Sequence, residues 1–390
     1  MNIIIERKCE QCGGEMEIQE TATLLECPWC GVRHFLEAGH ARYILPHKDI
    51  EGELIHVPYL RIKGSLFTCS HTGVHHRVVD TTVSATGINI LPPTLGVRPQ
   101  AMKLQFASDA IQTTYLKHSM KWHEAVDHAA PIQNQKIKAI LHQEWIGETL
   151  ATIYQPLIIQ DGVIRDGVTG DRLAKLPRED DLFAPIRMKT LGWHTTLHPT
   201  LCPNCGWDME SDHASVIHLC QNCDTAWRHQ SGQFKQVPFA TIMSSQPDTT
   251  YLPFWRMHVD FEGIELSNLA DFIRKTNIPR AIKPEWENEP LAFFCPAFKI
   301  RPKIFLRVAS QLTAAQQPIH EENVLPGQTT AVSLAAAEAE DAIKLILANS
   351  AVAKRTIMPI LSAISLANIK TTLVFLPFFD NGYEFCQEEL

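Results

Sequence analysis

The chain has 390 residues, of which 45% are hydrophobic and 20% are charged, and its formal net charge is −8. This composition is typical of a folded protein and excludes a disordered or fibrous chain. The length allows two or three domains with separate cores. The negative charge disfavours nucleic acid as the main partner, because the surface as a whole repels a phosphate backbone.

The N-terminal residues carry no apolar stretch followed by a small-residue cleavage site. The most apolar segment, residues 371–379, is far shorter than the roughly 20 residues of a spanning helix. We therefore expect a cytoplasmic protein without a membrane span.

Eight of the eleven cysteines form four Cys-x-x-Cys pairs. Such a turn brings two thiolates to one ion. Fourteen residues separate the two pairs in each half of the chain, close to the spacing of about 15–20 residues that is usual in zinc sites. The pattern predicts two metal sites, one formed by Cys9, Cys12, Cys27 and Cys30 and the other by Cys202, Cys205, Cys220 and Cys223.

Three of the four pairs are followed by a glycine, which readily adopts the left-handed backbone that such a turn needs. Gly13, Gly31 and Gly206 occupy these places, whereas Asp224 follows the fourth pair. Aspartate tolerates a positive φ better than most residues, so we expect ligation to survive there.

These two segments resemble the zinc-ribbon superfamily, in which two knuckles at the ends of short hairpins clasp one ion. The resemblance implies two Zn²⁺ per chain and leaves the function open. Iron in a rubredoxin-like site is the alternative, although rubredoxins separate their pairs by a longer loop. Four protein ligands leave no position for water or substrate, so we do not expect catalytic metal.

Further matches between the halves indicate an internal duplication. Tyr59-Leu60 recurs as Tyr251-Leu252, Arg98-Pro99 recurs as Arg301-Pro302, and residues 156–162 resemble residues 377–382, where an apolar strand leads to a turn. We expect an α+β fold in tandem duplication, each half a four-cysteine ribbon followed by a mixed α/β domain with antiparallel hairpins. The expected boundaries are ribbon 1 at 1–40, its domain at 41–185, a linker at 186–200, ribbon 2 at 201–235 and its domain at 236–390.

Helices are predicted for residues 101–129 and 334–353, the second with Ser333 as its N-cap. Residues 299–307 alternate charged and apolar side chains, which predicts a strand with one basic face. That face, a candidate site for an anion or a partner, carries Lys299, Arg301, Lys303 and Arg307. Trp29, Trp207 and Trp227 lie beside the knuckles, and we expect them to pack on the attached domains, with a partner contact as the alternative.

The segment 69–76 concentrates further candidate metal ligands, namely Cys69, His71, His75 and His76. Common catalytic motifs such as a P-loop or a His-Glu-x-x-His pair are missing from the sequence. The expected function is therefore a non-catalytic zinc-binding scaffold or adaptor that assembles other proteins. The alternatives are a nucleic-acid-binding module that uses the ribbons and the basic strand, and an enzyme or metalloregulator with an extra site at 69–76.

Overall fold

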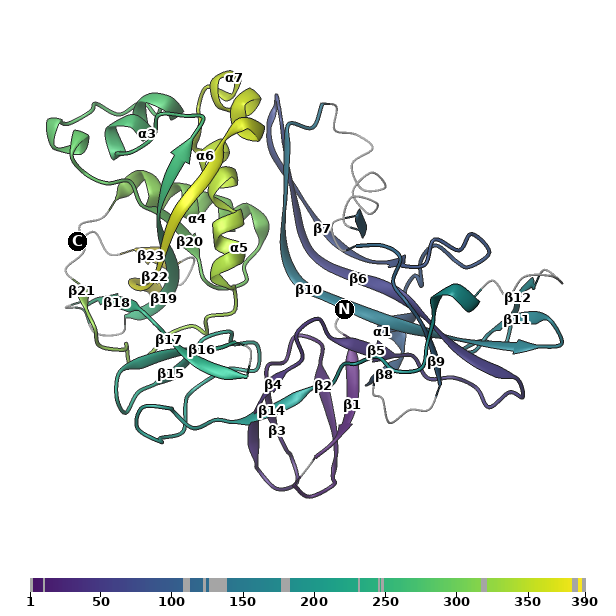
Figure 1. Cartoon of the computed structure of the whole chain (residues 1–390). Helices are drawn as coiled ribbons and strands as arrows, with labels where there is room; N and C mark the ends of the chain where they lie inside the picture. The colour runs from purple at the N-terminus through teal and green to yellow at the C-terminus, as the bar shows by residue number, and fades with distance from the viewer. Residues whose placement is uncertain are drawn as a thin grey trace. The chain divides into compact units, whose positions relative to one another are not determined.

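The structure is a computed structural model (Figure 1), and it describes residues 3–9, 11–107, 113–121, 124–125, 139–176, 183–230, 232–244, 246, 249–316, 321–380 and 385–387. The fold is mixed α/β with more strand than helix. The chain divides into two compact units. Unit 1 comprises residues 1–64, 78–135 and 147–199, and unit 2 comprises residues 65–77, 136–146 and 200–390.

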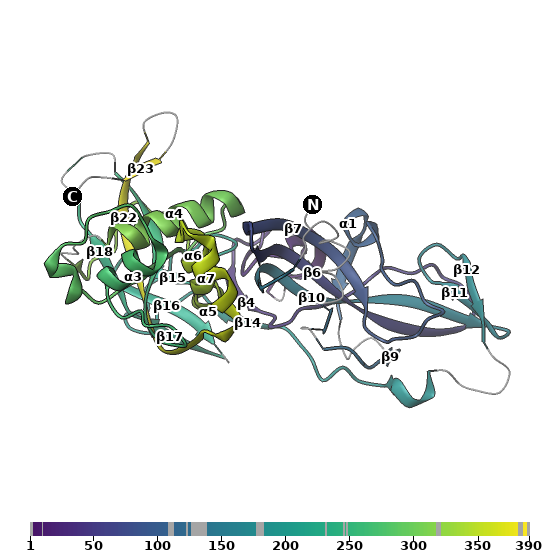
Figure 2. The same ribbon diagram turned by 90° about the horizontal axis from the view of Figure 1, so that it is seen from above.

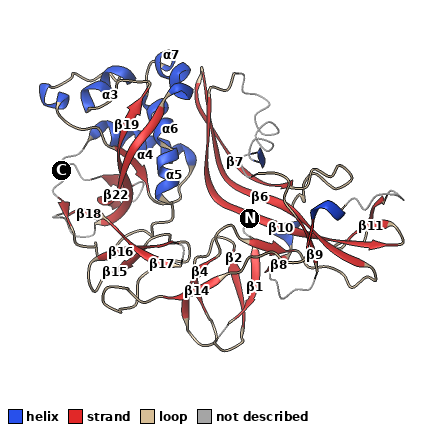
Figure 3. Ribbon diagram, viewed as in Figure 1, coloured by secondary structure: helices blue, strands red, loops and turns tan. Residues whose placement is uncertain are grey.

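The first part of the chain is almost entirely β-structure (Figure 3). Its strands are β1 (Ile4–Lys8), β2 (Glu15–Gln19), β3 (Leu24–Glu26), β4 (Arg33–Glu37), β5 (Arg42–Ile44), β6 (Glu53–Ser70), β7 (Gly73–Ser84), β8 (Lys103–Phe106), β9 (Thr114–Leu116), β10 (His142–Gln160), β11 (Val163–Asp166), β12 (Arg172–Lys175), β13 (Arg187–Met188) and β14 (Thr196–Pro199), with the short helices α1 (Arg98–Ala101) and η1 (Ala184–Ile186).

Eleven of these strands form one sheet, whose main path is β13-β9-β6-β10-β5-β8-β1-β2. β4 lies between β14 and β3 in a separate sheet. Residues of both hairpins of ribbon 1 enter the core of unit 1, because Ile5 and Ile18 of the first hairpin and Leu25 of the second are buried in the same apolar cluster as Tyr43. The first knuckle thus rises directly from the large sheet.

The rest of the chain contains more helix. Its elements are β15 (His218–Cys220), β16 (Thr225–Gln230), β17 (Gln233–Val237), β18 (Phe239–Ile242), β19 (Thr250–Glu262), α3 (Leu269–Thr276), η2 (Pro284–Glu287), β20 (Phe293–Pro296), α4 (Pro302–Ala315), β21 (Glu321–Glu322), α5 (Ala336–Asp341), α6 (Ile343–Ser350), α7 (Lys354–Ile357), η3 (Met358–Ala363), β22 (Ser365–Asp380) and β23 (Phe385–Gln387).

The helices of unit 2 gather around β19 and β22 (Figure 2). The sheet that contains these strands follows the path β20-β19-β22-β18-β21, with β23 beside β22. Its two faces bury different clusters, since Leu373 and Phe375 lie in one and Val374 and Leu376 in the other. This alternation is the period of two expected for a strand covered on both faces. Phe67, Cys69 and Ile146 belong to the segments 65–77 and 136–146 of unit 2, and they complete the larger cluster.

The two large sheets share a strand order. The path β6-β10-β5-β8 in the first sheet corresponds to β19-β22-β18-β21 in the second. In both, the short strand after the ribbon pairs in parallel with a long late strand, β5 with β10 and β18 with β22. The long late strand then turns back as an antiparallel hairpin, into β11 or β23.

Two predicted helices have different outcomes. The helix predicted for 334–353 is confirmed as α5 and α6, although Ala335 and not Ser333 is the N-cap of α5. The helix predicted for 101–129 is wrong over most of its described residues, because β8 and β9 lie within it. Only residue 101, at the end of α1, and residues 124–125 are helical there. Residues 108–112, 122–123 and 126–129 of that range lie outside the described residues.

The basic strand predicted for 299–307 is also wrong, because helix α4 begins at Pro302. Proline suits the first turn of a helix, where its missing N–H costs no hydrogen bond. Phe305, Ala309 and Leu312 are buried with helical spacing, and this longer pattern overrides the short alternation that precedes it. The predicted hairpin turn at Asp161-Gly162 is confirmed, with φ values of 51° and 68°. Among the described residues, no helix has both the length and the apolar character needed to cross a bilayer.

Candidate metal centres

The four cysteines of ribbon 1 converge on one point. Their sulfur atoms all lie within 4.8 Å of one another, with Sγ–Sγ distances of 3.8 Å from Cys9 to Cys30 and 3.6 Å from Cys12 to Cys27. A tetrahedron with metal–sulfur bonds of about 2.3 Å has edges of about 3.8 Å, whereas a disulfide bond measures about 2.0 Å. The spacing therefore matches a tetrahedral metal site and not a pair of disulfides.

Tight turns place these sulfurs. The Gly13 amide donates to the carbonyl of Cys9 at 2.8 Å, and the Gly31 amide donates to the carbonyl of Cys27 at 2.9 Å. Both glycines have a positive φ, of 72° and 70°. A side chain would strain this left-handed backbone, so the glycines predicted to form the knuckles do so.

Ribbon 2 repeats this geometry. Its four sulfurs also lie within 4.8 Å of one another, and the Sγ–Sγ distances are 3.7 Å from Cys202 to Cys223 and 3.5 Å from Cys205 to Cys220. The Gly206 amide donates to the carbonyl of Cys202 at 2.8 Å. Two four-cysteine sites that can hold metal ions are therefore present.

The fourth knuckle differs because its last residue also makes a tertiary contact. Asp224 adopts a φ of 48°, and its carboxylate accepts a hydrogen bond from the amide of Leu325 at 2.9 Å. Beside it, the side-chain amide of Gln221 donates to the carbonyl of Pro326 at 3.3 Å. A glycine at position 224 could form the turn but could not bind the loop, which explains the departure from the pattern.

Each centre contains a cysteine whose pKa is low. Burial raises the pKa of Cys27, but amide hydrogen bonds from Cys30 and Trp29 outweigh it and lower the value to about 7. Burial likewise opposes ionisation of Cys202, while the amides of Cys205 and Asn204 lower its pKa to about 6. Backbone N–H groups that point at sulfur stabilise a thiolate. The amides around Cys27 and Cys202 therefore favour the thiolate form that a metal ion needs.

Another cysteine in each centre resists ionisation. The Val32 amide lowers the pKa of Cys30, but burial and the neighbouring sulfurs raise it to about 12. Burial and the Cys205 sulfur raise the pKa of Cys220, also to about 12. Four thiolates cannot crowd together without a compensating cation. The donor set thus suits a divalent, thiophilic ion and leaves no coordination position for a substrate.

The segment 69–76 does not form a third group of metal ligands. Cys69 is buried in the core of unit 2, and burial raises its pKa to about 12. The Nε2 atom of His75 lies 3.1 Å from the hydroxyl of Ser70 and 2.9 Å from that of Thr72. His71 and His76 are exposed. Among the described residues, no cluster of three or more metal-ligating atoms includes this segment.

The four basic residues of 299–307 lie at the start of α4, two before the helix and two within its first two turns. Lys299, Arg301, Lys303 and Arg307 are all exposed, and the amide of Lys299 donates to the hydroxyl of Ser333 at 3.1 Å. They share a helix terminus instead of a strand face.

The tryptophans beside the knuckles divide into two kinds. Trp227 is buried, at 9% exposure, and its indole N–H donates to the hydroxyl of Thr225 at 2.9 Å. Trp29 and Trp207 are 72% and 62% exposed, so for them the predicted packing is wrong. Their large apolar rings are therefore left mostly in contact with water.

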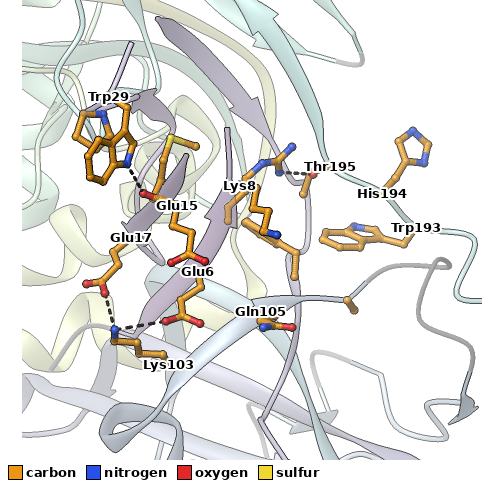
Figure 4. A pocket seen from close by; sticks show the side chains of 15 residues that line it. Glu6, Lys8, Glu15, Glu17, Trp29, Lys103, Gln105, Trp193, His194 and Thr195 are labelled. Carbon is orange, nitrogen blue, oxygen red and sulfur yellow. Dashed lines mark hydrogen bonds and ion pairs between the residues drawn. The ribbon is translucent and has the colours of Figure 1, made fainter. Parts of the chain in front are cut away.

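A groove beside ribbon 1 was not apparent from the sequence (Figure 4). It has a volume of about 1330 Å³ and lies entirely within unit 1. Strands β1, β2 and β8 contribute Glu6, Lys8, Glu15, Glu17 and Lys103, and Trp29 and Trp193 project from either side. The Lys103 ammonium lies 3.4 Å from Glu6 and 2.6 Å from Glu17. The alternation of exposed charges in β1 and β2 was the available signal, but only strand pairing places them on one face.

No protein-family model, curated protein or solved structure matches the chain significantly.

Proposed function

We propose that the chain is a non-catalytic adaptor in which two structural zinc ions, one per ribbon, hold binding surfaces in shape. The convergence of four cysteine sulfurs at tetrahedral spacing in each ribbon carries this proposal. Each ribbon spans too few residues to bury a core of its own, so metal ligation supplies much of its folding free energy. Four sulfur ligands complete the coordination of zinc and leave it no role in chemistry.

Zinc is preferred over iron because the pairs are separated by the short interval of a zinc ribbon. Elemental analysis of the purified chain tests this choice. We expect a colourless protein with two zinc ions per chain. Stoichiometric iron with a red colour would replace the zinc assignment by electron transfer.

The binding surfaces are proposed from the exposed tryptophans. Each ribbon presents one, Trp29 after the third cysteine of ribbon 1 and Trp207 after the first glycine of ribbon 2. Tryptophan is enriched among the residues that dominate protein interfaces. A closed metal site behind such a side chain keeps it rigid, which lowers the entropy lost on binding.

A duplication accounts for the shared organisation of the two parts of the chain. The strand path common to both large sheets supports it, and so do the hairpins. Leu157 faces Asp166 in the first, and Phe378 faces Gln387 in the second. Pro156 and Pro377 immediately precede these pairs, so the resemblance between 156–162 and 377–382 extends to strand register.

The parallel pairs agree with the same alignment. Tyr154 faces Ile44, and Phe375 faces Thr241, each two residues before the matched proline. Arg98-Pro99 opens α1, and Arg301-Pro302 opens α4. We therefore propose that α4 elongated, and that α3 was inserted, in the second copy.

The adaptor function is tested by identifying proteins that co-purify with the native chain and comparing their recovery with Trp29→Ala and Trp207→Ala. Both variants keep every zinc ligand. We expect a discrete partner that at least one substitution removes while zinc content stays at two. Substrate turnover by the purified chain, or unchanged recovery with both variants, would contradict the proposal.

A further inference from the structure

The groove beside ribbon 1 has the dimensions of a site for a chain segment. Its volume of about 1330 Å³ exceeds the roughly 300–1,000 Å³ of a typical small-molecule pocket. The groove crosses the strands in the order β8-β1-β2. Two strand spacings amount to about 10 Å, a distance that an extended peptide covers with about three residues.

One end of the groove already holds a cation over an aromatic ring. The Arg7 guanidinium lies 5.7 Å from the centre of the Phe106 ring and donates to the Thr195 hydroxyl at 2.6 Å. Phe106 lies 6.2 Å from Trp193, whose indole N–H donates to the carbonyl of Ala38 at 3.2 Å. The Arg7 guanidinium and the Trp193 indole N–H at this end of the groove therefore already have hydrogen-bond partners.

Trp29, at the other end of the groove, is held in place by contacts within ribbon 1 but is exposed to solvent. Its indole N–H donates to the carbonyl of Glu15 at 2.9 Å, and its ring lies so close to Gly14 that a Cβ at position 14 would collide with it. The side chain is nevertheless 72% exposed. Among the rings that the structure describes, cations lie over Phe106 and Trp286 and not over Trp29.

The charges around the Trp29 end of the groove favour a positively charged ligand. The three glutamates and three basic side chains that line the groove cancel, −3 + 3 = 0. Four thiolates around one Zn²⁺ add −4 + 2 = −2 at the Trp29 end, because Cys9 follows Lys8 and Cys27 precedes Pro28. Lys103 is shared by Glu6 and Glu17, and Glu15, which faces Lys8 across β1 and β2, also lines the groove.

We infer that this groove binds an extended basic segment of a partner protein, with an arginine or lysine side chain stacked on Trp29. Tryptophan is the best of the aromatic rings for a cation. The net negative charge supports capture of a basic chain and opposes a phosphate backbone. The inference rests on the proposed function, because the zinc–thiolate centre supplies the excess charge.

The test uses the full-length zinc-loaded chain and a short synthetic peptide that alternates glycine and arginine, titrated by calorimetry. The control probes are the same peptide with glutamate in place of arginine and a single-stranded oligonucleotide. We expect only the arginine peptide to bind, with an affinity that falls as salt is raised. Equal binding of the glutamate peptide, or preferred binding of the oligonucleotide, would overturn the inference.

Two variants locate the site. Trp29→Ala should weaken binding roughly 5- to 30-fold, the range of a partly desolvated cation–π contact. Trp29→Phe should restore part of the affinity. Trp207→Ala is the matched control, since it removes an equally exposed tryptophan from ribbon 2, and it should leave binding unchanged. An equal loss with both alanine variants, or no loss with Trp29→Ala, would contradict the site.

Zinc content measured on the same samples separates the two hypotheses. A chain that holds two zinc ions but does not bind the arginine peptide refutes the groove and leaves the adaptor proposal standing. A purified chain without zinc refutes the proposed metal staples regardless of what the peptide does.

Discussion

Ribbon 1 and ribbon 2 use the same four-ligand plan but are anchored at opposite knuckles. In ribbon 1 the first hairpin belongs to the large sheet, since β1 pairs with β8, and the second knuckle carries the exposed Trp29. In ribbon 2 the first knuckle is followed by the exposed Trp207, and the second is bound to the 324–326 loop through Asp224 and Gln221. In ribbon 1 the exposed tryptophan belongs to the knuckle whose hairpin is outside the large sheet, and in ribbon 2 it follows the knuckle that does not bind the 324–326 loop.

The exposed tryptophans also occupy different positions in the two ribbons. Gly14 follows the glycine of the first knuckle in ribbon 1, and Trp207 occupies the corresponding place in ribbon 2. Trp29 lies between the third and fourth cysteines of ribbon 1, where ribbon 2 has Asn222. Because the Trp29 ring covers Gly14, only one of the two places can hold an indole. The exposed tryptophan therefore belongs to the second knuckle in ribbon 1 and follows the first knuckle in ribbon 2.

The largest expected effect comes from removing one ligand. Cys202→Ser should lower the zinc content from two ions to one and unfold ribbon 2, because structural zinc contributes on the order of 10 kcal/mol to such a module. Loss of the Asp224 contact should then expose the loop around Leu325. Elemental analysis and hydrogen exchange measure these changes.

Cys9→Ser is the matched variant in the other ribbon. It should leave ribbon 2 and the 324–326 loop protected while exchange rises in β1 and β2. Loss of both ions from either single variant would mean that the two sites are not independent.

The next effect is a loss of stability in acid, which we expect in both units, since burial also lowers the pKa of His218 in unit 2, to about 3. His56 in unit 1 is 1% exposed, and burial lowers its pKa from 6.5 to about 4. The folded state holds it neutral, so its stabilisation is complete above pH 6.5 and is lost as the pH falls toward 4, by about 3 kcal/mol in total. Hydrogen exchange in β6 should report this loss.

His56→Gln removes the titrating group and keeps a polar atom that can bond to Thr113, which His56 contacts at 3.0 Å. Exchange in β6 of this variant should change less between pH 6.5 and 4 than in the native chain. An identical pH dependence would show that another group is responsible.

A smaller effect tests why the fourth knuckle lacks glycine. Asp224→Ala should cost about 1–3 kcal/mol, because it leaves the Leu325 amide without its acceptor and places alanine at a positive φ. Asp224→Gly keeps the turn and loses only the acceptor, and Asp224→Asn keeps both. Thermal unfolding should rank the stabilities Asn, Gly, Ala. Equal stability of the glycine and asparagine variants would remove the loop contact as the reason for aspartate.

The smallest effect concerns the indole over Gly14. Gly14→Ala should destabilise ribbon 1 by about 1 kcal/mol, because overpacking forces the ring to move. The same substitution combined with Trp29→Ala should cost less than the sum of the single changes. Denaturant unfolding of the four chains measures this coupling. Additive costs would show that the ring and the new methyl group do not compete.

The local chemistry of the knuckles was readable from the sequence. Cys9, Cys12, Cys27 and Cys30 lie close together along the chain, and a Cys-x-x-Cys-Gly turn has little freedom once φ is positive. The grouping of eight cysteines into two sites that can hold metal therefore follows from spacing alone. The identity of the ion stays a prediction.

Features that depend on long-range packing were decided only by the tertiary structure. The segment from Lys299 to Arg307 reads as a strand over its first residues, but burial of Phe305 and Leu312 selects a helix. Cys69 lies in a histidine-rich segment, yet its side chain completes a core built from residues far away. Asp224 and Trp29 have roles defined by Leu325 and Gly14. Short-range covalent spacing fixes a metal site, whereas burial depends on which distant apolar surfaces meet, and a linear pattern does not contain that information.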